Sequence, residues 1–190
     1  MMRQLTLFSL LLILGFGVQA QHEYDASKAY PFGRPNPKAP DAIKDYQPMI
    51  GNCECSYTTR NQDGEWSETK SMQWRFKYIM NGWAVQDETF TADSTYSGSI
   101  RQYSIEKEQW LVHYYTTLSL VEPLPTWKGN KEGDEIVLYK KQKAPNGMDG
   151  MYRITFYEMT NNGFKWKGEW IDDKATIVYP VFRIECQKMQ

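Results

Sequence analysis

Asp87, Glu88 and His113 are the side chains of this sequence best suited to proton transfer. An isomerase or a hydrolase could use one of the carboxylates with the imidazole as its acid and base. Asp87 and Glu88 are adjacent in a segment with strand character, so their side chains should point to opposite faces and cannot flank one bond. A serine or cysteine nucleophile would need a base, and His113 is the candidate for it. We therefore assign no catalytic residue and keep a barrel enzyme as an alternative to a binding protein.

A buried carboxylate at Asp87 would need a cationic partner, which Arg101, Arg153 or Arg183 could supply. Such a pair would be either a structural ion pair or a polar anchor for a ligand headgroup. His113 also has two interpretations. It lies either on the surface or rim of a sheet, or inside a cavity as a polar contact, depending on which face of its strand points inward.

Aromatic residues make up 15% of the chain, and many recur at every second position. Trp74, Phe76 and Tyr78 share one face of an extended segment, while Arg75 and Lys77 share the other. These rings could fill a core or line a ligand cavity, and both interpretations are open. The candidate ligand-binding residues are Trp74, Phe76, Tyr78, Trp83, Asp87, Arg101, His113, Trp166 and Trp170.

The elements that carry these residues are predicted to be strands joined by tight turns. Asn-Gly pairs at 81–82, 146–147 and 162–163 are strong signals for two-residue hairpins, because both central positions of a type I′ turn need positive φ. The expected strands lie near residues 50–60, 68–80, 83–92, 96–104, 109–118, 123–128, 135–142, 150–159, 164–171 and 175–187. Consecutive hairpins predict an all-β, antiparallel up-and-down barrel of about 8–10 strands, since closure removes exposed edges. A two-sheet sandwich is the structural alternative.

Three cysteines could form one disulfide in an oxidising compartment. Cys53 and Cys55 lie at the start of the first expected strand and Cys186 near the end of the last, and these strands are antiparallel neighbours in a closed barrel. We expect a bridge between Cys53 and Cys186, with Cys55 and Cys186 as the alternative pairing. Three reduced, buried cysteines are the other possibility. A thiolate metal site lacks a fourth ligand, so we predict no metal and no cofactor.

The N-terminal residues are typical of a secretory signal peptide. Arg3 precedes an apolar stretch of 14 residues from Leu5 to Val18, and a small-residue cleavage site ends at Ala20. The apolar stretch is shorter than the roughly 18 to 20 residues of a spanning helix. We expect a signal peptide at 1–20, a Pro-rich extended arm at 21–44 and a barrel domain at 45–190. The arm could be a tether, or it could plug the barrel mouth or bind a partner. The mature chain should be exported to the periplasm or the extracellular space, without an integral membrane segment.

Charge adds little to the choice of partner. The formal net charge is −1, and loss of Arg3 with the signal peptide makes it −2. Since no long basic run is present, we expect no binding to nucleic acid.

Several segments resemble the uncharacterised lipocalin-like bacterial proteins of the calycin type. They are Asp45 to Cys55, Trp74 to Tyr78, Asn81 to Glu88, Ile100 to Tyr103 and Trp110 to His113, and the likeness spans about residues 44 to 188. The resemblance implies a barrel open at one end with a ligand-sized cavity. Cys53 stands where the lipocalin tryptophan would be, and Arg183 is the candidate for the arginine that packs over it. The related haem-binding barrels would need a histidine near the last strand, and the sequence has none after His113.

Together these observations favour an exported barrel that binds a small apolar or amphipathic molecule in its interior. The enzyme using Asp87 or Glu88 with His113 is one alternative. A structural or interaction protein of the envelope, with a filled barrel, is the other.

Overall fold

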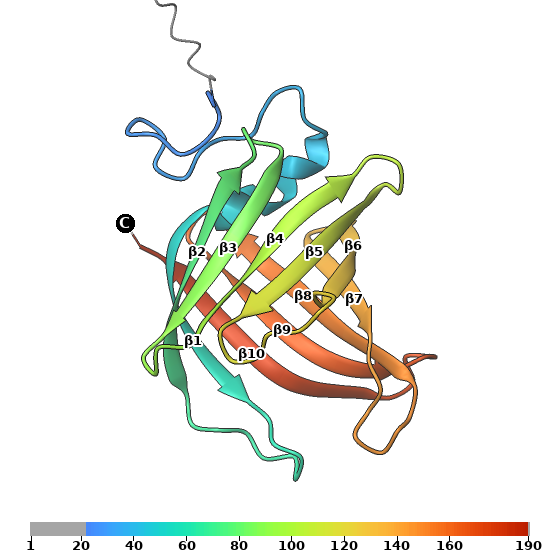
Figure 1. Ribbon diagram of the computed structural model, residues 1–190. Coiled ribbons are helices and arrows are strands. Elements are labelled where there is room, and N and C mark those ends of the chain that lie inside the picture. Colours follow the sequence, from blue (N-terminus) through green and yellow to red (C-terminus); the bar gives the residue numbers. More distant parts are fainter. Residues whose placement is uncertain (1–21, 190) are drawn as a thin grey trace, which may run out of the picture.

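The protein is an antiparallel β-barrel of ten strands, described here over residues 22–189 of a computed structural model. The predicted signal peptide lies outside the described residues. Each strand pairs with its neighbour in sequence, and the first strand pairs with the last, so the barrel is closed (Figure 1). The strands are β1 (Gly51–Thr59), β2 (Lys70–Ile79), β3 (Ala84–Thr91), β4 (Tyr96–Ser104), β5 (Gln109–Thr116), β6 (Thr126–Glu132), β7 (Glu135–Lys141), β8 (Gly150–Thr160), β9 (Gly163–Asp172) and β10 (Val178–Lys188). The predicted up-and-down barrel is confirmed, and the sandwich is not formed.

Period-two alternation turns one face of each strand into the barrel. In β2, Trp74, Phe76 and Tyr78 are buried, whereas the intervening Arg75 is exposed. The loop after β2 comprises residues 80–83, because Ile79 pairs with Ala84, so it is longer than the predicted two-residue turn. Asn81 at φ 54° and Gly82 at φ 78° do have the positive values that the Asn-Gly pair predicts. Each strand therefore buries one row of side chains, and the turns connect strands whose buried rows face the same interior.

A 3-10 helix, η1 (Asp41–Met49), closes the end of the barrel at which β1 begins (Figure 1). It buries Ile43, Tyr46 and Met49. The Tyr46 ring meets the Trp110 ring edge to face at a centroid distance of 4.8 Å, and Trp110 Nε1 donates a hydrogen bond to Asp45 at 3.0 Å. This end of the interior is thus packed solid by side chains.

The segment before η1 is attached to the β2–β3 hairpin at the closed end, away from the opposite mouth (Figure 1). The Tyr24 amide donates to Asn81 Oδ1 at 2.9 Å, and the Asn81 amide donates to Asp25 Oδ1 at 2.6 Å. A side chain at Gly82 would place its Cβ 2.5 Å from the Arg34 carbonyl oxygen. Glycine at this turn therefore serves both the positive φ and the close approach of the arm.

The seam between β1 and β10 carries a disulfide between Cys55 and Cys186, whose Cα atoms are 4.1 Å apart. The preferred pairing of Cys53 with Cys186 was wrong, and the alternative is the one formed. The antiparallel register places Cys55 directly opposite Cys186 and Cys53 opposite Lys188. Cys53 is a reduced, buried thiol in the core.

Arg183 does not pack over the barrel floor as the lipocalin resemblance implies. It is exposed, and its guanidinium lies 4.2 Å from the ring centroid of Trp66. An arginine does pack against aromatic rings inside the barrel, but it is Arg101 of β4.

Candidate ligand-binding cavity

The half of the barrel away from η1 contains a cavity of about 500 Å³. It opens between the loops that follow β1, β3, β5 and β7, because Thr59, Thr91, Leu118 and Gln142 all line it. The aromatic residues of its wall are Tyr57, Trp74, Tyr114, Trp127, Tyr152, Trp166 and Phe182. Most of the wall is apolar, and the polar groups are concentrated in a few places.

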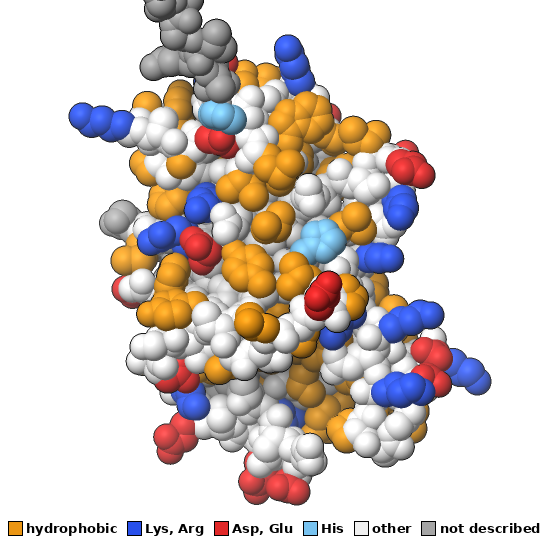
Figure 2. All heavy atoms as spheres, in the orientation of Figure 1, with side chains coloured by type: hydrophobic (Ala, Val, Ile, Leu, Met, Phe, Trp, Pro, Cys, Tyr) orange, Lys and Arg blue, Asp and Glu red, His pale blue; other side chains and the backbone are white. Residues whose placement is uncertain are grey.

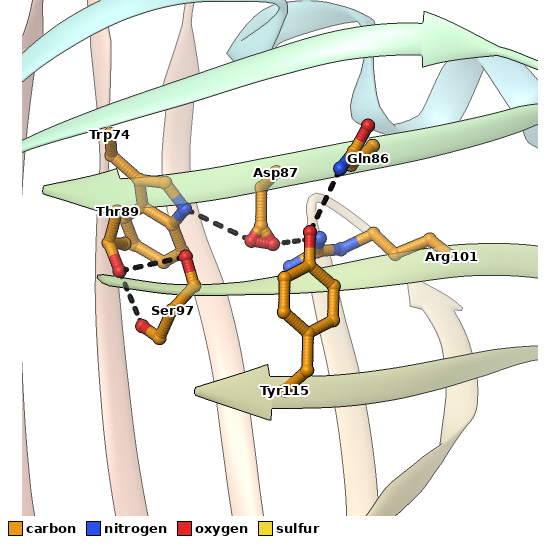
Figure 3. Close-up of polar contacts among 7 residues, drawn as sticks. All are labelled: Trp74, Gln86, Asp87, Thr89, Ser97, Arg101 and Tyr115. Atoms are coloured by element: carbon orange, nitrogen blue, oxygen red, sulfur yellow. Dashed lines mark hydrogen bonds and ion pairs between the residues drawn. The ribbon is translucent and has the colours of Figure 1, made fainter. Parts of the chain in front are cut away.

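A buried ion pair forms the base of the cavity. Arg101 Nη1 donates to Asp87 Oδ1, and Trp74 Nε1 donates to Asp87 Oδ2 at 3.2 Å (Figure 3). The side chains of Arg101 and Asp87 are only 2% and 3% exposed. The strand register brings them together, since Asp87 lies opposite Ser99 on β4 and Arg101 follows two residues later on the same face.

The guanidinium of Arg101 is also enclosed by rings. Its central carbon lies 5.0 Å from the ring centroid of Tyr46, 5.2 Å from that of Phe76 and 5.6 Å from that of Phe156. Burial, the largest single effect, lowers the pKa of Arg101, but the Asp87 carboxylate and the Tyr46 hydroxyl together outweigh burial and raise that pKa. The arginine is therefore a fixed cation that joins the packed floor to the cavity above.

Hydroxyl groups line one side of the cavity, along β3 and β4. The Thr89 oxygen lies 2.5 Å from Ser97 Oγ, and Thr89 also donates to the Ser97 carbonyl at 3.3 Å (Figure 3). Nearer the mouth, Thr91 donates to Asp93 at 2.5 Å and the hydrogen bond lowers the pKa of that carboxyl. These hydroxyl groups already form hydrogen bonds within the protein, so they offer a ligand fewer unpaired donors and acceptors.

Trp127 of β6 and Lys140 of β7 also line the cavity. Lys140 Nζ lies 4.7 Å from the ring centroid of Trp127. Burial lowers the pKa of Lys140, because the charged ammonium loses part of its hydration.

The structure places four of the nine predicted ligand-binding residues in the cavity wall: Trp74, Asp87, Arg101 and Trp166. Phe76 and Tyr78 are buried in the core but do not reach the cavity. Trp170 is buried outside the lining, and its Nε1 donates to the Gln142 carbonyl at 2.8 Å.

Trp83 and His113 do not line the cavity, contrary to their place in the predicted set. Trp83 is 40% exposed because it lies in the turn before β3 begins. In β5, Val112 and Tyr114 face inward, so alternation directs His113 outward, where Nδ1 lies 2.9 Å from Thr126 Oγ1.

The proton-transfer group suggested by the sequence does not assemble. Asp87 lies inside and is held by Arg101, whereas Glu88 lies on the outer face with its carboxylate 3.8 Å from Lys77 Nζ. His113 is also on the outer face. The wall of the barrel therefore separates the histidine from the buried carboxylate.

Sequence reasoning missed Tyr114, Trp127, Lys140 and Tyr152. A signal for Lys140 was present, because the alternation in β7 puts it on the same face as the buried Ile136 and Leu138. A lysine on an apolar strand face is unusual.

Within residues 22–189, no three His, Cys, Asp or Glu side chains are grouped closely enough to hold a metal ion. No helix in that part of the chain has the length and apolarity needed to cross a membrane. On the face shown in Figure 2, acidic and basic side chains are interspersed.

No protein-family model matches the sequence, and no curated protein matches it significantly. Among solved structures, the crystal structure of Rv2717c from M. tuberculosis is similar, with a TM-score of 0.53 at 9% identity, covering 80% of this chain and 100% of that one. The two share a fold. A second match, EF1p2_mFAP2b bound to DFHBI, has 13% identity and covers 78% of this chain and 100% of that one, but its TM-score of 0.36 supports no inference.

Proposed function

We propose that the protein is an exported, lipocalin-like barrel that binds a small, mainly apolar molecule in its cavity. The observation that carries the proposal is the cavity itself, about 500 Å³ with Trp74 and Trp166 in its wall. This volume lies within the roughly 300–1,000 Å³ typical of small-molecule sites. One end is closed by η1 and the other is open, so a ligand would enter between the loops.

The arrangement of polar groups favours binding over the alternatives. A structural envelope protein is expected to have a filled interior, and here only the end next to η1 is filled. The carboxylate-histidine pair expected of an enzyme is not assembled inside, because Asp87 is engaged by Arg101 and Trp74 and His113 does not line the cavity. Both features favour a ligand-binding protein over a structural protein or an enzyme.

Export is supported by two separate features. The signal-peptide pattern covers residues 1–20. The Cys55–Cys186 disulfide is of the kind that persists in oxidising compartments such as the periplasm or the extracellular space.

The test is a binding titration with the neutral dye N-phenyl-1-naphthylamine, whose emission rises in apolar surroundings. Ile184→Trp fills the cavity from β10, where Ile184 lines the wall and is 6% exposed. We expect it to weaken dye binding about tenfold or more, equivalent to about 1.4 kcal/mol. Glu185→Trp is the matched control, because the neighbouring Glu185 is exposed on the outer face.

Thermal unfolding of both variants checks that the barrel is intact. No dye binding by the wild-type protein, or equal binding by Ile184→Trp and Glu185→Trp, would refute the cavity as the site. If the dye binds as expected, native mass spectrometry of protein purified from its own host will show whether a natural ligand is retained.

A further inference from the structure

Four neighbouring strands, β5 to β8, each place one polar group in the wall of the cavity. Together we call them the Lys140 cluster: Tyr114, Trp127, Lys140 and Tyr152. The Trp127 ring lies 6.1 Å from the Tyr114 ring and 6.2 Å from the Tyr152 ring, centroid to centroid. Lys140 lies opposite Tyr152 in the β7–β8 register, and its Nζ is 4.7 Å from the Trp127 ring centroid.

The hydrogen-bonding groups of the cluster have no protein acceptor in the described part of the chain. Trp127 Nε1 is buried there without a partner. Lys140 Nζ and the hydroxyls of Tyr114 and Tyr152 make no hydrogen bond to the described residues either. Ammonium and indole N–H groups can only donate, and a phenol can donate as well. Lys140, Tyr114 and Tyr152 line the open cavity, so their unpaired donors are accessible to an acceptor on a ligand.

The charges around the cavity point to an anionic acceptor. Within the described residues, Lys140 has no carboxylate within ion-pair distance, whereas Asp87 is paired with Arg101. Glu169, behind the wall, is 2.8 Å from Arg153. Asp93 lines the mouth on the β3–β4 turn, where it accepts a hydrogen bond from Thr91 and is separated from β7 by β4, β5 and β6.

Partial burial of Lys140 also favours an anionic ligand. It lowers the pKa of Lys140, because the ammonium loses part of its hydration and no carboxylate compensates for it among the described residues. A bound anion would restore a counter-charge and raise that pKa.

We propose that the Lys140 cluster binds the anionic headgroup, a carboxylate, of an amphipathic ligand whose apolar body lies between Trp74, Trp166 and Ile154. This inference rests on the proposed function and narrows the ligand class. Lys140 supplies the counter-charge, and the Tyr114 hydroxyl donates a hydrogen bond to a carboxylate oxygen. Charge-assisted hydrogen bonds of this kind are stronger than neutral ones.

The test compares two competitors that have the same chain and differ in headgroup charge. Decanoate and 1-decanol are each used to displace N-phenyl-1-naphthylamine at neutral pH. We expect decanoate to bind about tenfold more tightly than 1-decanol, a difference of about 1.4 kcal/mol. Lys140→Met should abolish this preference, so that decanoate binds this variant no more tightly than 1-decanol does.

Lys141→Met is the matched control, because Lys141 is the next residue of β7, is exposed and does not line the cavity. It should behave as the wild-type protein does. Equal binding of the two competitors to the wild-type protein would overturn the anion site, as would a loss of both in Lys140→Met when unfolding shows it to be folded. These outcomes leave dye binding intact, whereas failure of the proposed function removes the dye binding itself.

Discussion

The buried pair of Asp87 and Arg101 allows a sharp prediction about stability. Asp87→Ala removes the carboxylate and leaves a guanidinium that is 2% exposed and enclosed by three aromatic rings. An uncompensated buried charge of this kind costs about 3–5 kcal/mol. Typical domains unfold with a free energy of about 5–15 kcal/mol, so the variant should lose a large part of its stability.

The matched control is the next residue of the same strand. Glu88 faces outward, and its carboxylate is 3.8 Å from Lys77 Nζ with both side chains 32% exposed. Exposed pairs contribute about 1 kcal/mol or less, so Glu88→Ala should have a small effect. The two variants differ in which side of the barrel wall loses a carboxylate.

The assay is equilibrium unfolding in urea with the disulfide intact, followed by tryptophan fluorescence. With a urea slope of about 1–3 kcal/mol per molar, Asp87→Ala should lower the midpoint by about 1 M or more. Glu88→Ala should lower it much less. The double variant Asp87→Leu with Arg101→Met should be more stable than the sum of the single changes allows, because it leaves no charge unpaired.

Either of two results would refute a dependence of Arg101 on Asp87. If Asp87→Ala lowers the midpoint no more than Glu88→Ala, Arg101 does not depend on Asp87 for its charge balance. Additive effects of Asp87→Leu and Arg101→Met in the double variant would lead to the same conclusion.

Two further predictions concern the closed end of the barrel. Gly82→Ala should lower the free energy of unfolding by about 1 kcal/mol or more beyond Gly147→Ala and should make the arm sensitive to limited proteolysis. Both glycines have positive φ, but only at Gly82 would a Cβ meet the arm. Equal proteolysis of the two variants would contradict this. Burial raises the pKa of Tyr46 to about 12 from 10.0, so its contribution to stability is full below pH 10 and is lost as the pH rises toward 12. Because its hydroxyl makes no hydrogen bond to the described residues, Tyr46→Phe should be within about 1 kcal/mol of the wild-type stability at pH 7. Between pH 8 and 11.5 its urea midpoint should fall less than that of the wild-type protein. An equal fall would exclude ionisation of Tyr46 as a cause of the alkaline loss of stability.

The strands and the order of their hairpins could be predicted from the sequence because their causes are local. Alternation of Trp74, Phe76 and Tyr78 with polar residues depends only on the two-residue period of a strand. The Asn81-Gly82 turn depends on backbone conformations that few residues adopt. Neither feature requires knowledge of the partner strand beyond the next hairpin.

The disulfide shows where local information ends. Cys53 and Cys55 are two residues apart, so both face the same side of β1 and both are buried. The choice between them depends on the register of β1 against β10, which places Cys186 opposite Cys55. That register joins strands separated by most of the chain, and no turn between them sets it.

The site was predictable only in part for a similar reason. In β5, Leu111, His113 and Tyr115 alternate with Trp110, Val112 and Tyr114, and both rows contain large apolar residues. The hydrophobic pattern therefore does not say which row faces inward. The barrel turns Tyr114 in and His113 out, and this removes the histidine from the site.

A barrel with alternating aromatic faces follows from the sequence alone, since side-chain alternation and turn chemistry are properties of short segments. The packing of the ten strands settles which rings fill the floor, such as Phe76, and which border a cavity of about 500 Å³, such as Trp74 and Trp166. It also brought Lys140 to Tyr114, Trp127 and Tyr152 from four strands. The physical reason is that unfilled volume and convergent donors depend on how distant strands pack around a common axis, which no local period encodes.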